Sequence, residues 1–195
     1  MEKISPFCVR FRLALGILTI TALFWDLKFQ FFTVQSNALV GIWLLLSAIF
    51  GNSEKVQNSL TGFVRGGITV YICITCLVYA IVLNPGGGFN WPSIVEHYIT
   101  PILFVIDWYL TETKSKQYQW KYAVWWIVYP IGYMGVTLIR GYITNFYPYF
   151  FMDLPVLGFM GFLKWFCILI SLFLFIGLIL VAINRKIYSK QNQPQ

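Results

Sequence analysis

The uncharged run 165–184 (WFCILISLFLFIGLILVAIN) is the feature that most limits what this chain can fold into. About 20 consecutive apolar residues span the hydrocarbon core of a bilayer as a single α-helix. Long apolar runs recur along the whole chain, and only 11% of its residues are charged, against roughly 25% in a typical soluble domain. The sequence therefore predicts an all-α protein that crosses a membrane several times.

Polar or Gly/Pro-rich connections divide the apolar sequence into six spans. These form one predicted domain, residues 1–190, which a short polar tail, 191–195, follows. The predicted spans are Phe11–Trp25, Phe32–Phe50, Phe63–Leu83, Val95–Thr111, Tyr122–Tyr142 and Gly161–Asn184. Since the first span is short, we expect its Arg10 and Arg12 side chains to extend to the membrane interface.

The basic residues predict the orientation of the six spans, because cytoplasmic connections are enriched in Lys and Arg. One side would carry Lys3, Arg10, Arg12, Lys55, Arg65, Lys114, Lys116, Lys121, Arg185, Lys186 and Lys190. The other side would carry Lys28, Arg140 and Lys164. Both termini are therefore expected in the cytoplasm. Because the net charge of +7 sits at the ends of apolar segments, we expect no nucleic-acid partner.

The histidine and cysteine content argues against a metal or cofactor. His97 is the single histidine, which excludes a bis-histidine haem and disfavours a transition-metal site. Cys73 and Cys76 lie one helical turn apart within a predicted span, where we interpret them as small apolar side chains. The spacings of a P-loop, a Rossmann fingerprint or a zinc protease do not occur.

The stretch FFTVQSN (31–37) places polar residues inside the second span. Thr33, Ser36 and Asn37 share one helix face, from which Gln35 points away. Such residues commonly form hydrogen bonds between membrane helices, and their spacing alone favours that structural role. The alternative is that they line a site.

His97, at the start of the fourth span, has two interpretations as well. Pro101 removes the helical hydrogen bond to the His97 carbonyl, so we expect a distorted backbone there. Imidazole is the usual general base near neutral pH, and a hydroxyl nucleophile beside it would suffice for catalysis. The sequence leaves open whether His97 is catalytic or structural. Asp107 lies roughly 15 Å deeper along the helix, and we expect it to pair with Arg65 instead.

The fifth span and the connection after it supply further polar candidates. Pro130 predicts a kink that frees the Trp126 carbonyl. Tyr133 and Arg140 share one face of this span, either as packing that ends in an interfacial arginine or as the wall of a cavity with an anion site. Asp153, in the last outer connection, is a better candidate than Glu96 for a carboxylate near the outer site. In the predicted topology, Thr33, His97, Arg140 and Asp153 all lie near the outer side.

Three segments together resemble the bacterial relatives of the androgen-induced protein family. They are FFTVQSN opening the second span, EHYITP opening the fourth, and LIRGYITNFYPYFFMDLPVLG after the kinked fifth. The resemblance covers most of the chain and implies a six-span helical bundle. Eukaryotic members of that superfamily are threonine hydrolases of fatty acid esters of hydroxy fatty acids. Their threonine and histidine correspond by position to Thr33 and His97.

The resemblance implies an intramembrane hydrolase of lipid (fatty acyl) esters in a bacterial plasma membrane. Thr33 would be the nucleophile and His97 the base, near the outer leaflet, while Ser36 and Asn37 would support the oxyanion or orient the histidine. Tyr133, Arg140 and Asp153 would supply further contacts to the lipid substrate. The competing hypothesis is a non-enzymatic binding protein or small transporter whose ligand occupies the same polar outer pocket.

Overall fold

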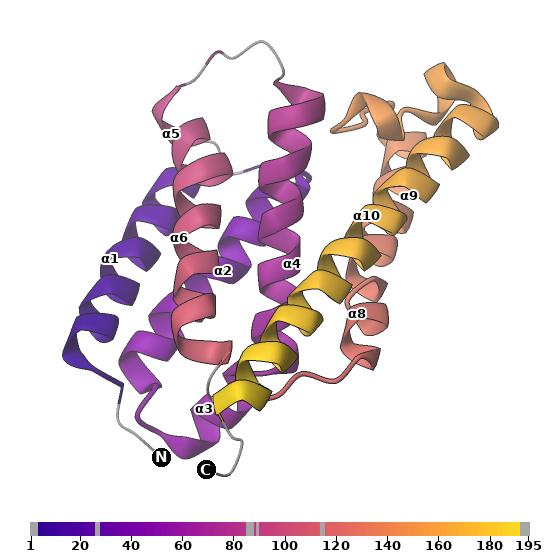
Figure 1. Ribbon diagram of the computed structural model, residues 1–195. Helices are drawn as coiled ribbons and strands as arrows, with labels where there is room; N and C mark the ends of the chain where they lie inside the picture. The colour runs from indigo at the N-terminus through magenta and orange to yellow at the C-terminus, as the bar shows by residue number, and fades with distance from the viewer. Residues whose placement is uncertain (1–3, 26–27, 85–87, 89, 114–115, 192–195) are drawn as a thin grey trace.

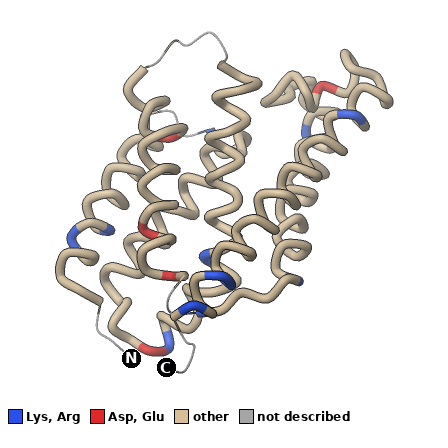
Figure 2. Tube along the Cα trace, viewed as in Figure 1, with Lys and Arg blue, Asp and Glu red and all other residues tan. Residues whose placement is uncertain are grey.

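The computed structural model describes residues 4–25, 28–84, 88, 90–113 and 116–191, and in these residues every regular element is a helix. The predicted tail residues 192–195 lie outside this part of the chain. Long helices run up and down beside one another, and both termini lie at the same end, called the termini end below (Figure 1). Figure 2 shows that Lys and Arg concentrate toward this end.

The first half of the chain forms three long helices and one short connecting helix. Their bounds are α1 (Pro6–Leu23), α2 (Phe32–Phe50), α3 (Glu54–Leu60) and α4 (Phe63–Val78), which continues as the π-helix η1 (Tyr79–Leu83). Helix α1 begins before the predicted Phe11, because Ser5 accepts a hydrogen bond from the Cys8 N–H and Pro6 occupies the first turn.

The second half begins with a helical stretch whose hydrogen-bond register changes along its length. It consists of α5 (Trp91–Ile94), the π-helix η2 (Val95–Ile99), α6 (Thr100–Asp107) and the π-helix η3 (Trp108–Glu112). The remaining elements are α8 (Lys121–Trp125), α9 (Val128–Thr144), the 3₁₀-helix η4 (Phe150–Met152) and α10 (Leu154–Gln191). Helix α10 begins before the predicted Gly161 and bends at Gly158, whose φ of 66° suits glycine.

Five helical stretches of the described chain are long and apolar enough to cross a membrane. They are Pro6–Leu23, Phe32–Phe50, Phe63–Leu83, Lys121–Thr144 and Leu154–Gln191. The stretch from α5 to η3, which contains the predicted fourth span, is not among them. It contains Glu96, His97, Asp107 and Glu112, and these side chains lower its mean hydropathy.

Both predicted proline distortions are confirmed. Near Pro130 the chain breaks between α8 and α9, and the Tyr71 hydroxyl donates to the freed Trp126 carbonyl at 3.0 Å. Near Pro101 the helix widens into η2, in which the Thr100 N–H bonds the Val95 carbonyl five residues back. This is the wider turn that π-helices use, frequently at functional sites.

Packing divides the interior into two apolar clusters. One lies between α1, α2, α4 and α6 around Val40, Leu44 and Phe104, all fully buried. The other lies between α4, α8, α9 and α10, where the Phe32 ring packs edge-on against Phe173. The two clusters meet along α2 and α4, so the start of α2 is held between both halves of the bundle.

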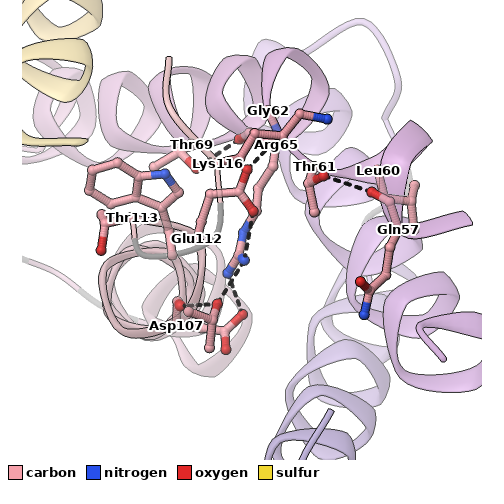
Figure 3. Close-up of polar contacts among 12 residues, drawn as sticks. Gln57, Leu60, Thr61, Gly62, Arg65, Thr69, Asp107, Glu112, Thr113 and Lys116 are labelled. Atoms are coloured by element: carbon pink, nitrogen blue, oxygen red, sulfur yellow. Dashed lines mark hydrogen bonds and ion pairs between the residues drawn. The ribbon is translucent and has the colours of Figure 1, made fainter. Parts of the chain in front are cut away.

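A buried group of charged residues joins α1, α4 and the α6–η3 stretch near the termini end. The predicted Arg65–Asp107 pair is confirmed, with Nη2 and Oδ2 2.6 Å apart (Figure 3). Arg65 also pairs with Glu112. The prediction that Arg12 reaches the interface is wrong: the side chain is buried and its Nε lies 3.0 Å from Asp107. The buried guanidinium is instead paired with a carboxylate on a neighbouring helix, as a charge removed from water requires.

Candidate functional site

The structure brings Thr33 and His97 together although they are far apart in the sequence. Thr33 Oγ1 lies 3.4 Å from His97 Nε2, and both side chains are 8% exposed. Thr33 occupies the first turn of α2, and His97 lies in the π-helix η2. This separation is slightly longer than an ideal hydrogen bond, as is common for catalytic pairs without substrate.

The other ring nitrogen determines which tautomer His97 adopts. Nδ1 lies 3.0 Å from the Ser93 carbonyl oxygen, one helical turn earlier. A carbonyl oxygen can only accept, so this contact places the proton on Nδ1, and the Ser93 hydroxyl, 3.4 Å from the same nitrogen, then accepts from it as well. In the neutral ring Nε2 is then the acceptor, and its lone pair faces the Thr33 hydroxyl. This is the arrangement that a general base requires.

A tyrosine fixes the plane of the His97 ring. Tyr79, at the start of η1, stacks on the imidazole with ring centroids 3.6 Å apart and 19° between the planes. The Tyr79 hydroxyl lies 2.6 Å from the Ser93 hydroxyl, and it accepts from the Asn84 amide at 3.2 Å. The ring is therefore held on one face and at one edge. Neither Tyr79 nor Ser93 was predicted from the sequence, although Ser93 lies four residues before the histidine, on the same helix face.

The π-helix at His97 changes which backbone carbonyl Pro101 faces, and Asn37 donates a hydrogen bond to this carbonyl. The sequence predicted that the His97 carbonyl would lose its bond to Pro101. In the π-helical register, the carbonyl that faces the missing N–H of Pro101 belongs to Glu96 instead. Asn37 Nδ2 donates to the Glu96 carbonyl and to the Thr33 carbonyl, both at 3.0 Å. One side chain thus connects the two backbone segments that carry the pair.

Ser36 also acts between helices. Its hydroxyl donates to the Thr33 carbonyl at 3.0 Å and lies 2.8 Å from Thr75 Oγ1 on α4. The donors of Ser36 and Asn37 bond to protein groups. These two residues of the polar face of α2 therefore have the structural role, hydrogen bonding between helices, that their spacing favoured. Gln35 points elsewhere, as predicted: it accepts from the Tyr129 hydroxyl and donates to the Phe29 carbonyl.

Tyr149, in the connection between α9 and α10, is a site residue that the sequence analysis missed. The Thr33 N–H, one of the first-turn donors that a helix leaves unpaired, donates to the Tyr149 hydroxyl at 3.4 Å. Burial raises the pKa of this phenol above its ordinary value, so it keeps its proton at neutral pH. The only sequence signal was the aromatic run NFYPYFF, which is equally typical of interfacial packing.

Thr33 and Tyr149 separate two hollows of different character. An open pocket of about 300 Å³ lies on one side, with His97, Lys28 and Glu96 among its lining residues. An apolar cavity of about 50 Å³ lies on the other side, between α2, α4, α9 and α10. Thr33 and Tyr149 line both, so an atom at the Thr33 hydroxyl can be reached from either side.

The other predicted site residues have different positions. Tyr133 lines the apolar cavity, and its hydroxyl donates to the Gln30 carbonyl at 2.8 Å. Arg140 is exposed, with its guanidinium 5.8 Å from the Phe146 ring centroid. Asp153 Oδ1 accepts from the Val156 N–H at the start of α10. Neither Arg140 nor Asp153 lines either hollow, so the structure does not bring them to the Thr33–His97 pair.

Comparison with known proteins found no matching family model, no matching curated protein and no matching solved structure. Among the described residues, no group of His, Cys, Asp and Glu is arranged to hold a metal ion.

Proposed function

We propose that this protein is an intramembrane threonine hydrolase of lipid esters, related to the androgen-induced protein family. One observation carries the proposal: Thr33 Oγ1 lies 3.4 Å from a histidine nitrogen whose tautomer the Ser93 carbonyl sets as an acceptor. A hydroxyl is a weak nucleophile until an adjacent base removes its proton. Here the base, its orienting carbonyl and a stacked ring are all present.

The reaction would proceed in two halves. His97 Nε2 takes the proton as Thr33 Oγ1 attacks the ester carbonyl carbon, and the protonated imidazole then gives this proton to the departing alcohol. Water next attacks the acyl-threonine, passes its proton to Nε2, and the carboxylic acid is released as Thr33 regains its hydrogen. We assign the oxyanion contact to the Tyr149 hydroxyl, which lies against the Thr33 N–H, because the donors of Ser36 and Asn37 already bond to protein carbonyls.

We further propose that the α5–η3 stretch is a sixth span and that both termini face the cytoplasm. An even number of spans agrees with termini at one end of the bundle (Figure 1). The four acidic and imidazole groups of this stretch need not prevent insertion, because His97, Asp107 and Glu112 are buried against protein. The Lys and Arg distribution supports the orientation, and it would put the Thr33–His97 pair near the outer leaflet of a plasma membrane.

The test is covalent labelling of the purified protein in detergent with a fluorophosphonate probe, followed by mass spectrometry. We expect an adduct on Thr33 in the unaltered chain, and no adduct in Thr33→Ala or His97→Gln. The matched control is Thr69→Ala, since Thr69 is another fully buried threonine, bonded to the Arg65 carbonyl away from both hollows. Labelling that persists in Thr33→Ala would refute the assignment.

Turnover of 4-nitrophenyl esters separates the enzyme from the competing binding protein or transporter. An enzyme should lose at least about a hundredfold in kcat when His97 is replaced, the usual scale of general-base catalysis. A ligand-dependent thermal shift without any turnover in the unaltered chain would favour the binding protein instead.

A further inference from the structure

The apolar cavity beside Thr33 has no role in positioning the catalytic pair. It lies between α2, α4, α9 and α10, and Met134 and Leu169 form part of its wall. Ile74 on α4, Pro130 on α9 and Phe173 on α10 lie deepest, at the positions along each helix farthest from Thr33 and η4. Apolar side chains therefore line the inner end of the cavity.

Apart from Thr33 and Tyr149 at its mouth, the polar groups in the cavity wall are bonded to backbone carbonyls. Thr75 Oγ1 donates to the Tyr71 carbonyl at 3.1 Å, and the Tyr133 hydroxyl donates to the Gln30 carbonyl at 2.8 Å. A buried water needs two to four polar partners, whereas cavities lined by apolar groups stay dry and take apolar ligands. The cavity thus suits a hydrocarbon group better than water or a polar headgroup.

The open pocket on the other side of Thr33 has a different chemistry. Lys28, Glu96 and His97 bring charged and polar groups to its wall, and most of the remaining wall is apolar. Its volume of about 300 Å³ is several times larger than that of the cavity. The two parts of an ester that meets Thr33 would therefore find different surroundings. The side that holds His97 must also admit the departing alcohol and then water, because His97 exchanges a proton with both.

We propose that the cavity binds the acyl group of the ester substrate, that the open pocket binds its alcohol part, and that Phe173 limits the acyl group to a short chain. An apolar cavity of roughly 150 Å³ holds a benzene molecule, and this one, at about 50 Å³, admits only a few carbons. The substrate would then be a lipid ester in which the alcohol part carries the long hydrocarbon. The inference rests on the proposed function in placing the ester carbonyl at Thr33.

Chain-length profiles with 4-nitrophenyl acetate, butyrate, octanoate and palmitate test the limit. The unaltered protein should show its highest kcat/KM with acetate or butyrate. Phe173→Ala should raise the octanoate-to-butyrate ratio at least tenfold, since one methylene in an apolar pocket changes kcat/KM by about 10–200-fold. The matched control is Phe175→Ala on the same helix, because Phe175 is 59% exposed and Phe173 only 6%. An unchanged profile in Phe173→Ala would overturn the inference.

A second variant covers the case in which Phe173→Ala does not fold. Met134→Phe would fill the cavity from α9 and should reduce butyrate turnover relative to acetate. Its control is Val136→Phe, on the exposed side of the same helix. Equal loss for both esters in Met134→Phe would contradict the assignment of the cavity to the acyl group.

A binding experiment distinguishes failure of this inference from failure of the proposed function. Thr33→Ala, which cannot form an acyl-enzyme, is irradiated with the photoreactive short-chain acid 4,4-azipentanoate, and the crosslinks are located by mass spectrometry. Crosslinks at Met134 or Leu169 without ester turnover in the unaltered chain would refute the hydrolase and keep the cavity as an acyl site. Crosslinks confined to other residues, in a chain that does hydrolyse esters, would refute the cavity assignment alone.

Discussion

Replacing Asp107 by alanine should destabilise the protein more than any other single loss of charge in the buried group that it forms with Arg12 and Arg65. Asp107 accepts three hydrogen bonds from Arg12, at 3.0–3.3 Å, and one from Arg65 at 2.6 Å. The three side chains are only 2–6% exposed. Solvent therefore screens these interactions little, and the discount that applies to surface ion pairs does not apply here.

The magnitude follows from what each arginine would retain. Without Asp107, Arg65 keeps Glu112, whereas Arg12 keeps the Thr111 hydroxyl and the ring of Trp43, 5.0 Å away. Removing one partner of a buried ion pair costs about 3–5 kcal/mol, mostly because the remaining charge is left without a counterion. We expect Asp107→Ala to fall in this range, which for a chain of this size corresponds to a decrease in Tm of roughly 10 °C.

The assay is thermal unfolding in a mild detergent, followed by far-UV circular dichroism, with Arg12→Ala and the double variant completing a mutant cycle. Two contacting charges should couple by about 0.5–3 kcal/mol, so the double variant should lose less than the sum of the single losses. Glu54→Gln controls for loss of a carboxylate, because Glu54 is exposed. A Tm for Asp107→Ala within a degree or two of this control would refute the reasoning.

Three further predictions concern the site and the packing around it. Tyr79→Leu removes the ring that stacks on His97 and should reduce kcat about two- to tenfold; the ¹⁵N spectrum of this single histidine should broaden, and an unchanged spectrum would contradict the positioning role. Asn37→Leu removes the side-chain donor to the Glu96 carbonyl, while the Thr33 carbonyl keeps the Ser36 hydroxyl, and should lower the free energy of unfolding by about 1–3 kcal/mol, seen as a fall in the Tm. Gly66→Ala would place a Cβ in collision with the Trp126 ring and should lower the Tm, whereas Gly132→Ala, with open space around it, should not.

The features that could be predicted from the sequence depend on local chemistry. A proline cannot donate a backbone hydrogen bond wherever it lies in a helix, so Pro101 and Pro130 each predicted a distortion that the structure contains. The Arg65–Asp107 pair could be predicted because both residues fall at the same depth in consecutive spans, where a lone charge would be costly. In these cases the chemistry of the residue itself indicates the distortion or the ion pair that the structure must contain.

The features that could not be predicted depend on which helices pack together. Arg12 was expected at the interface because the sequence does not say that α1 packs beside Asp107 on α6. Tyr149 belongs to a connection whose path over the start of α2 follows from the fold as a whole. Conversely, Arg140 and Asp153 looked suitable by charge and side of the membrane, but these two properties do not fix where a side chain lies within one leaflet.

The polar face of α2 shows why its two interpretations, helix contact or site, are not alternatives. A π-helical turn at His97 brings this side chain to Thr33, and in that register Pro101 faces the Glu96 carbonyl. Asn37 satisfies this carbonyl and the Thr33 carbonyl at once, so the hydrogen bonds that hold the helices together also set the separation between hydroxyl and imidazole. A helix contact that is itself required by the distortion at His97 belongs to the site, although Asn37 touches neither reacting atom.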